Sequence, residues 1–312
     1  MPTLLLLSRD NVCYKTLIEK VNLGDLTILS AEQPDQIRSM APQADILLGE
    51  PALIAAALPY AEKLVWAQST YAGVDALMAP DMRRDYRLTN IRGIFGPLMS
   101  EYIFAHLLSM TRHLPIYREQ QQHHHWAAHP YQPLSQRQML ILGTGSIGQH
   151  VAATARTFGM SVIGVNRSGR EVAGFDETYQ ISALPRLLPE ADVIVSILPA
   201  TRETRHLLTA DLLALCRSDS VLFNVGRGDL IESGVLYQAL KQGHPGAAVV
   251  DVFEQEPLEP HHPLWTLPNL IITPHNAAWS LPTEVFRIFE RNYLHYLQDE
   301  PLDYQINFEA GY

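Results

Sequence analysis

The sequence has few cysteines, no long apolar run and no excess of basic residues, and each absence excludes a class of protein. Two cysteines in 312 residues make a disulfide framework unexpected. The longest apolar opening, residues 4–7, is far shorter than the roughly 20 residues of a membrane helix and lacks the flanks of a signal peptide. The formal net charge of −10 disfavours nucleic acid as a partner, because phosphate binding needs a basic surface. A cytoplasmic protein is expected, and a small anionic substrate stays open because one or two local arginines can bind it.

Apolar runs alternate with helical patterns along the whole chain, which is typical of α/β proteins. The length is too great for one ordinary core and suits two domains. In the first part, strands are expected at 3–7, 45–49 and 64–68. In the second part, they are expected at 138–142, 161–165, 193–198, 221–225, 247–252 and 270–273. Long helices are expected at 98–113, directly after Pro97, and at 283–297.

These elements predict an α/β fold with two Rossmann-like, doubly wound parallel-sheet domains. A flavodoxin-like substrate domain is expected over 1–98 and 280–312, with the last helix packing back on it. A dinucleotide-binding domain is expected over 99–279. Cys216 ends the apolar run 212–215, so a packed side chain is expected there and not a nucleophile.

A glycine-rich turn follows the apolar run 139–142 and opens a helical pattern, which is the context that a dinucleotide-binding motif requires. Gly143 permits a tight turn, Gly145 lets the backbone approach a pyrophosphate, and Gly148 allows close packing of helix on strand. Ser146 precedes the helical pattern 147–158, which begins at Ile147, and the free N–H groups at the start of this helix favour an anion. The turn therefore predicts a dinucleotide cofactor.

The end of the next strand indicates which dinucleotide is bound. Asn166 lies 18 residues after Gly148, where an NAD enzyme usually has an acidic residue for the ribose 2′-hydroxyl. Arg167, Ser168 and Arg170 follow, and an arginine here accommodates a 2′-phosphate. NADP(H) is therefore preferred and NAD(H) stays an alternative, as does the interpretation of both arginines as solvated loop charges.

Three residues that follow apolar runs predict one catalytic site: Arg227, Glu256 and His275. Loops at the carboxyl ends of parallel strands are where open α/β sheets build their sites. An arginine can hold a carboxylate and polarise a carbonyl, a histidine can carry a proton, and a glutamate can keep that histidine charged. Such a set suits the reduction of a 2-keto acid.

With these motifs, the chain resembles the D-isomer-specific 2-hydroxyacid dehydrogenases over nearly its whole length. The resemblance includes the glycine turn, 198–204, 226–228, 251–257 and 274–275, with 29 residues from Arg227 to Glu256 and 19 from Glu256 to His275. The runs 263–265 and 273–278 are most similar to the glyoxylate/hydroxypyruvate reductase branch, type A. The formate dehydrogenase branch is disfavoured, because it has Gln where this chain has Glu256.

The resemblance implies a role for each residue. Arg227 would bind the substrate carboxylate and keto oxygen, His275 would exchange the proton, and Glu256 would orient His275 and raise its pKa. Asp251 would bind the nicotinamide carboxamide. Further cofactor contacts would come from Leu198, Pro199, Thr204, Val225, Gly226, Arg227 and His275.

Other substrate contacts are implied at three places. The loop at Ala72, Gly73 and Val74 would grip the substrate carboxylate through backbone N–H groups, in a cleft between the two domains. Trp126 would reach the active site of a partner subunit in a homodimer. Trp279 is expected to pack, but it is close enough to His275 in sequence to touch substrate, and Trp66 is expected to pack. The run 123–125 of three histidines is not expected to hold a metal, because adjacent residues point in different directions.

The sequence therefore predicts an NADPH-dependent reductase of small 2-keto acids, converting glyoxylate to glycolate and hydroxypyruvate to D-glycerate. Two alternatives stay open. One is a D-2-hydroxyacid dehydrogenase for a bulkier acid, and the other is a non-catalytic dinucleotide-sensing protein, because fold does not fix function.

Overall fold

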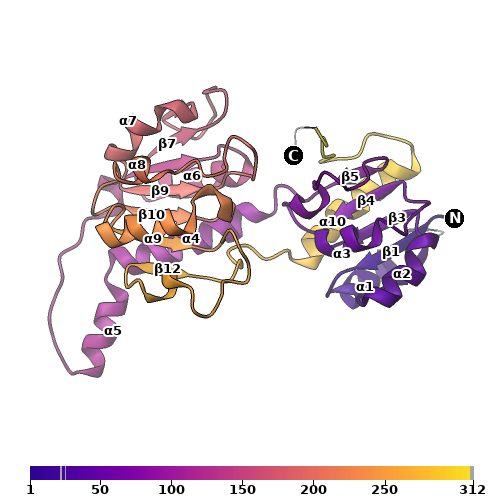
Figure 1. Cartoon of the computed structure of the whole chain (residues 1–312), viewed down its shortest axis with the longest axis horizontal. Helices are drawn as coiled ribbons and strands as arrows, with labels where there is room; N and C mark the ends of the chain where they lie inside the picture. The colour runs from indigo at the N-terminus through magenta and orange to yellow at the C-terminus, as the bar shows by residue number, and fades with distance from the viewer. Residues whose placement is uncertain (22, 25, 310–312) are drawn as a thin grey trace. The chain divides into compact units, whose positions relative to one another are not determined.

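The chain forms two α/β units, each built around one parallel sheet (Figure 1). This computed structural model describes every residue except 22, 25 and 310–312. One unit comprises Met1–Ile94 and Ser280–Tyr312, and the other comprises Phe95–Trp279. The predicted fold class of two parallel-sheet α/β domains is confirmed. Within the described residues, no helix has the length and apolar character that crossing a membrane requires.

The first unit has a five-stranded sheet in the order β2-β1-β3-β4-β5, which is the flavodoxin-like order. All five strands are parallel, and Leu4, Leu5, Leu6 and Leu7 of β1 are fully buried, as expected for a strand covered on both faces. The strands are β1 (Thr3–Leu7), β2 (Thr27–Ser30), β3 (Ile46–Gly49), β4 (Trp66–Ser69) and β5 (Arg87–Thr89). The helices are α1 (Asn11–Val21), α2 (Pro34–Met40), α3 (Pro51–Ala57) and α10 (Pro282–Leu297).

Helix α10 brings the end of the chain back into the first unit. Its Asn292 is fully buried and donates hydrogen bonds to Gln68 Oε1 at 3.0 Å and to the Asp303 carbonyl at 3.1 Å. The ring of Trp66 stacks on Phe289 of α10 with centroids 5.3 Å apart. Trp66 is therefore a packing residue, as expected.

The second unit has a seven-stranded parallel sheet in the order β12-β11-β10-β9-β6-β7-β8, a Rossmann order with one added strand. The strands are β6 (Gln138–Leu142), β7 (Ser161–Val165), β8 (Glu177–Tyr179), β9 (Val193–Ser196), β10 (Val221–Asn224), β11 (Ala247–Val250) and β12 (Leu270–Ile272). The helices are α4 (Phe95–Thr111), α5 (Leu114–Gln122), α6 (Ser146–Thr157), α7 (Leu184–Leu187), α8 (Ala210–Leu213) and α9 (Ser233–Gln242).

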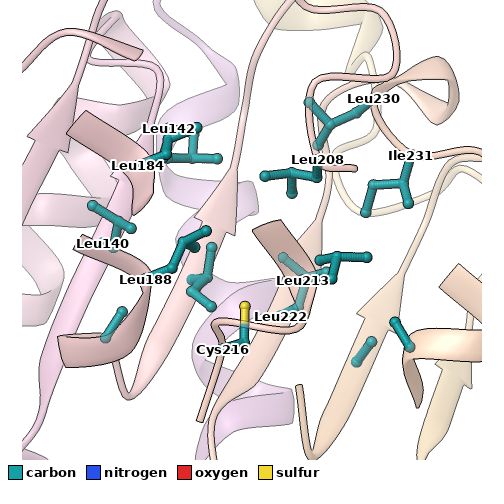
Figure 2. Close-up of a cluster of buried hydrophobic side chains, with 14 of the residues drawn as sticks. Leu140, Leu142, Leu184, Leu188, Leu208, Leu213, Cys216, Leu222, Leu230 and Ile231 are labelled. Atoms are coloured by element: carbon teal, nitrogen blue, oxygen red, sulfur yellow. The ribbon is translucent and has the colours of Figure 1, made fainter. Parts of the chain in front are cut away.

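Alternate residues of each central strand in this sheet enter two different cores. Leu140 and Leu142 of β6 join a cluster with residues of α7, α8 and α9, while Met139 and Ile141 join a cluster with residues of α4 and α6. Figure 2 shows the first cluster, including Cys216. Burial raises the pKa of the Cys216 thiol to about 12, so its interpretation as a packed side chain is confirmed.

The structure differs from the sequence prediction mainly at three strands and at helix α4. Strands β2, β5 and β8 were not expected; each has only three or four residues, and β2 and β8 leave their side chains partly exposed, so neither produces an apolar run. Helix α4 begins at Phe95 and not after Pro97. A proline is tolerated in the first helical turn, where its missing N–H is not needed.

Candidate active site

The loops that carry Arg227, Glu256 and His275 leave the same edge of the second unit's sheet. They follow β10, β11 and β12, which are neighbours and run parallel. The carboxyl ends of all three strands therefore lie side by side. This arrangement brings together residues that are 48 positions apart in the sequence.

His275 and Glu256 form a hydrogen-bonded pair. Nδ1 of His275 lies 2.8 Å from Glu256 Oε2, and the other carboxylate oxygen accepts the backbone N–H of Phe253 at 2.9 Å. A carboxylate can only accept, so Nδ1 carries a proton and Nε2 is the nitrogen that faces away from Glu256. His275 has a φ of 52°, in the left-handed region that non-glycine residues rarely adopt.

The pair shifts both pKa values in the direction that keeps the imidazole charged. The hydrogen bond to Glu256 raises the pKa of His275 above its ordinary value, although partial burial and the Arg227 charge act against this. Burial favours the protonated carboxyl of Glu256, but the hydrogen bonds from His275 and Phe253 outweigh it and lower the pKa. A charged imidazole can donate a proton from Nε2.

Two glycines place Arg227 near this pair. A Cβ on Gly226 would lie 2.6 Å from the Leu198 carbonyl oxygen, and one on Gly228 would lie 1.9 Å from the Phe253 carbonyl carbon. Only glycine fits at these positions, so the Arg227 loop packs directly against the Leu198 loop at Gly226 and against the Glu256 loop at Gly228. Nη1 of Arg227 donates to the Gly226 carbonyl at 2.8 Å. The Arg227 charge lowers the pKa of Glu256 as well as that of His275.

A second histidine–glutamate pair joins the loop after β9 to the loop that carries Glu256, and the sequence analysis missed it. Nε2 of His206 is 2.9 Å from Glu254 Oε1, and Glu254 Oε2 accepts the N–H and the hydroxyl of Ser233 at 2.7 and 2.9 Å. His206 also has a positive φ, 51°. No local sequence pattern signals this contact, because the two residues are 48 positions apart. Glu254 thus ties its loop both to the loop of His206 and to the start of α9.

Asp251 supports the turn that carries His275. Its carboxylate is 2% exposed and accepts hydrogen bonds from the Thr273 hydroxyl at 2.5 Å and from the N–H groups of Asn276 and Ala277, both at 2.9 Å. Its carbonyl accepts the His275 N–H at 2.9 Å. The predicted contact of Asp251 with a nicotinamide carboxamide stays a prediction.

The glycine turn has the shape expected for a phosphate site. Gly143 has a φ of +109°, and a Cβ on Gly148 would lie 2.0 Å from the Gly143 carbonyl oxygen, so both positions require glycine. Helix α6 begins at Ser146 with Gly145 at its N-cap. Among the described residues, no side chain caps this end and no atom lies within 4 Å of a Cβ built on Gly145. The open helix end can accept an anion.

The Asn166 side chain organises the loop after β7. Its Nδ2 donates to Thr144 Oγ1 at 3.3 Å and to the Arg170 carbonyl at 2.9 Å, and its Oδ1 accepts from Ser168 N and Oγ at 3.1 and 3.3 Å. Arg167, Ser168 and Arg170 are exposed on this loop. The hydrogen bonds of Asn166 thus fix the path of this loop, and the guanidinium groups of Arg167 and Arg170 stay at the surface.

The remaining predicted cofactor residues follow β9 and β10 at the same sheet edge. Leu198 and Val225 are buried, while Pro199 is exposed. The Thr204 hydroxyl is buried and used within its own loop, because it donates to the Pro199 carbonyl at 2.6 Å and accepts from Thr201 N at 2.9 Å.

In the first unit, the predicted substrate loop follows β4. Ser69 Oγ bonds to the N–H and the carbonyl of Tyr71, and Asn90 Nδ2 donates to the Ala72 carbonyl at 2.7 Å. Val74 is buried, and Gly73 is half-buried. These bonds fix the path of the loop.

Two tryptophans named from the sequence are exposed. Trp126 is fully exposed, and Trp279 is 60% exposed. The expectation that Trp279 packs is therefore wrong. It is the last residue of the second unit and follows the turn that Asp251 holds.

Comparison with known proteins identifies the family. The model for the NAD-binding domain of D-isomer specific 2-hydroxyacid dehydrogenases matches residues 104–277. The chain belongs to this family. The predicted NAD(P)-dependent dehydrogenase is thereby confirmed.

Individual relatives agree with the family assignment. A family structure from Aeromonas salmonicida subsp. salmonicida A449 is 56% identical with a TM-score of 0.95, covering 98% of this chain and 99% of that chain. The NADPH-dependent glyoxylate/hydroxypyruvate reductase of Sinorhizobium meliloti, solved with NADP and sulfate, is 26% identical with a TM-score of 0.87, and each chain is fully covered. Glyoxylate/hydroxypyruvate reductase A of Serratia proteamaculans is 33% identical over 213 residues, 65% of this chain and 67% of that protein.

The two histidine–glutamate pairs allow a matched test of the dehydrogenase site. Asparagine tolerates the left-handed region, so His275→Asn and His206→Asn remove each imidazole without a new backbone conflict. We expect His275→Asn to lower kcat by about 10²–10⁴-fold, the usual contribution of a general acid. His206→Asn should change kcat by less than about tenfold, because it removes only a loop contact. Steady-state kinetics on both variants checks this. Similar losses of kcat in the two variants would contradict the expectation that His275 is the general acid.

Proposed function

We propose that this dehydrogenase reduces small 2-keto acids with NADPH, converting glyoxylate to glycolate and hydroxypyruvate to D-glycerate. The observation that carries the proposal is the His275–Glu256 pair beside the Arg227 charge at the carboxyl edge of the sheet. The relatives named glyoxylate/hydroxypyruvate reductase support the choice of substrate.

Each residue of the set has a defined task in this reaction. Arg227 binds the substrate carboxylate through its planar guanidinium and stabilises the negative charge that develops on the keto oxygen. His275 donates the proton at Nε2 to that oxygen, and in the reverse direction the same nitrogen accepts it. Glu256 holds the imidazole in place and keeps it charged until the proton leaves.

NADP(H) fits the residues at the sheet edge. When bound, it supplies the hydride for the keto carbon. Ser146, Ile147 and Gly148, at the open start of α6, would bind its pyrophosphate. The exposed Arg167 and Arg170 would bind its 2′-phosphate. The Sinorhizobium meliloti relative was solved with NADP, and NAD(H) stays the alternative.

Further substrate contacts rest on the family resemblance. Backbone N–H groups at Gly73 and Val74, in the loop that begins at Ala72, would bind the substrate carboxylate, and Trp279 would touch the substrate. A cytoplasmic location also stays a prediction.

We infer a homodimer from the arm formed by α5 and the residues after it. Figure 1 shows α5 extending away from the rest of its unit. No residue of α5 is buried, although Leu114, Ile116 and Tyr117 are large and apolar, and Trp126 beside it is fully exposed. A helix this short needs packing to be stable, and a second copy of the chain would provide it. Sedimentation as a monomer would contradict this inference.

The function is tested by following NADPH absorbance with glyoxylate, hydroxypyruvate, pyruvate and phenylpyruvate, each also with NADH. We expect kcat/KM to be highest for glyoxylate or hydroxypyruvate with NADPH. Faster turnover of phenylpyruvate would support the bulkier-acid dehydrogenase instead. Cofactor binding without turnover of any 2-keto acid would favour a dinucleotide-sensing protein.

The cofactor assignment is tested separately with Arg167→Ala. Loss of a charge-assisted hydrogen bond to the 2′-phosphate should lower the NADPH-to-NADH ratio of kcat/KM by about 10–100-fold. Arg287→Ala, which removes an exposed arginine of the other unit, is the control and should leave the ratio unchanged. An unchanged ratio in Arg167→Ala would overturn the assignment.

A further inference from the structure

A chain of hydrogen bonds connects helix α4 to the turn that carries His275. The hydroxyl of Tyr102, on α4, lies 2.6 Å from Thr273 Oγ1, and Thr273 Oγ1 donates to Asp251 Oδ1 at 2.5 Å. A threonine hydroxyl has one proton. Since that proton is used on Asp251, Tyr102 must be the donor to Thr273. The donors therefore follow one order: Tyr102 donates to Thr273, and Thr273 donates to Asp251.

Asp251, the last acceptor in this series of hydrogen bonds, holds the turn around His275. Asp251 accepts the N–H groups of Asn276 and Ala277 on its carboxylate and the N–H of His275 on its carbonyl. His275 itself has a left-handed backbone, which persists only where surrounding contacts impose it. Asp251 supplies those contacts, and Thr273 restrains Asp251.

Tyr102 is suited to act as a permanent donor. Burial raises its pKa to about 12, so the phenol keeps its proton over the working pH range of most enzymes. Its ring packs edge-on against His106, one helical turn away on α4, with centroids 4.7 Å apart. This packing limits the directions in which the hydroxyl can point.

We propose that Tyr102 is a positioning residue for His275, acting through Thr273 and Asp251. The inference rests on the proposed role of His275 as proton donor. Without the Tyr102 hydroxyl, Thr273 Oγ1 is free to rotate away from Asp251, and the turn is held less firmly. His275 then spends less time in the orientation that Glu256 fixes, so the proton transfer slows while substrate binding by Arg227 is retained.

The test is Tyr102→Phe, with Tyr86→Phe as a matched control. Burial raises the pKa of Tyr86 to about 12 as well, but its hydroxyl has no hydrogen-bond partner among the described residues. We expect Tyr102→Phe to lower kcat by roughly tenfold, the effect of one lost hydrogen bond, with the KM of the keto acid unchanged. Tyr86→Phe should keep wild-type kcat and KM. Unchanged kcat in Tyr102→Phe, or a rise in KM alone, would overturn the proposal.

Variants of Thr273 test whether the loss of kcat in Tyr102→Phe is transmitted through Thr273. Thr273→Val should lower kcat as Tyr102→Phe does, the double variant should be no slower than the worse single one, and Thr273→Ser should restore kcat. Additive losses in the double variant, or no recovery with serine, would contradict the proposed path.

Hydrogen exchange separates this proposal from the proposed function, because it needs no turnover. In Tyr102→Phe and Thr273→Val, the amides of residues 275–277 should exchange faster than in the wild type, and in Tyr86→Phe they should not. If these amides exchange faster but the protein reduces no keto acid, the positioning role of Tyr102 is supported and the proposed reductase function is refuted. If exchange is unchanged but the enzyme is active, the positioning role of Tyr102 is refuted and the proposed reductase function is supported.

Discussion

The hydrogen bond between His275 and Glu256 depends on a constraint that the parallel sheet imposes. The two residues are carried by loops that leave the neighbouring strands β11 and β12 at the same edge. Parallel strands lie about 4.8 Å apart, so loops that leave adjacent strands can bring side chains into contact. Gly228 then allows the Arg227 loop, from β10, to touch the backbone of Phe253. The candidate site is thus a product of strand order and close backbone packing.

Two pairs of the same kind show that a histidine–glutamate contact alone does not define a site. His206 and Glu254 form a bond of nearly the same length as His275 and Glu256. The difference is electrostatic, because the charge of Arg227 acts on both His275 and Glu256. A charged imidazole beside an arginine would suit a 2-keto acid, whereas the His206–Glu254 contact holds two loops together.

Much of the fold and the candidate site could be predicted from the sequence, and the exceptions have physical causes. Strands covered on both faces, such as β1 and β6, are continuous apolar runs and are readily recognised. Short or partly exposed strands such as β8 have no such pattern. The glycine turn and the ends of β10, β11 and β12 are local signals. The Tyr102–Thr273 and His206–Glu254 contacts join residues 171 and 48 positions apart, so only the folded chain reveals them.

The central claim is that Glu256 keeps His275 charged, and an NMR titration of the imidazole tests it most directly. The protein has 13 histidines, so the His275 signal is identified by its absence from the spectrum of His275→Asn. In the wild type this signal should titrate above the ordinary histidine pKa of about 6.5, and in Glu256→Gln its pKa should fall. Glu254→Gln should leave it unchanged. An imidazole that titrates at the ordinary value in the wild type, or that does not respond to Glu256→Gln, would contradict the account.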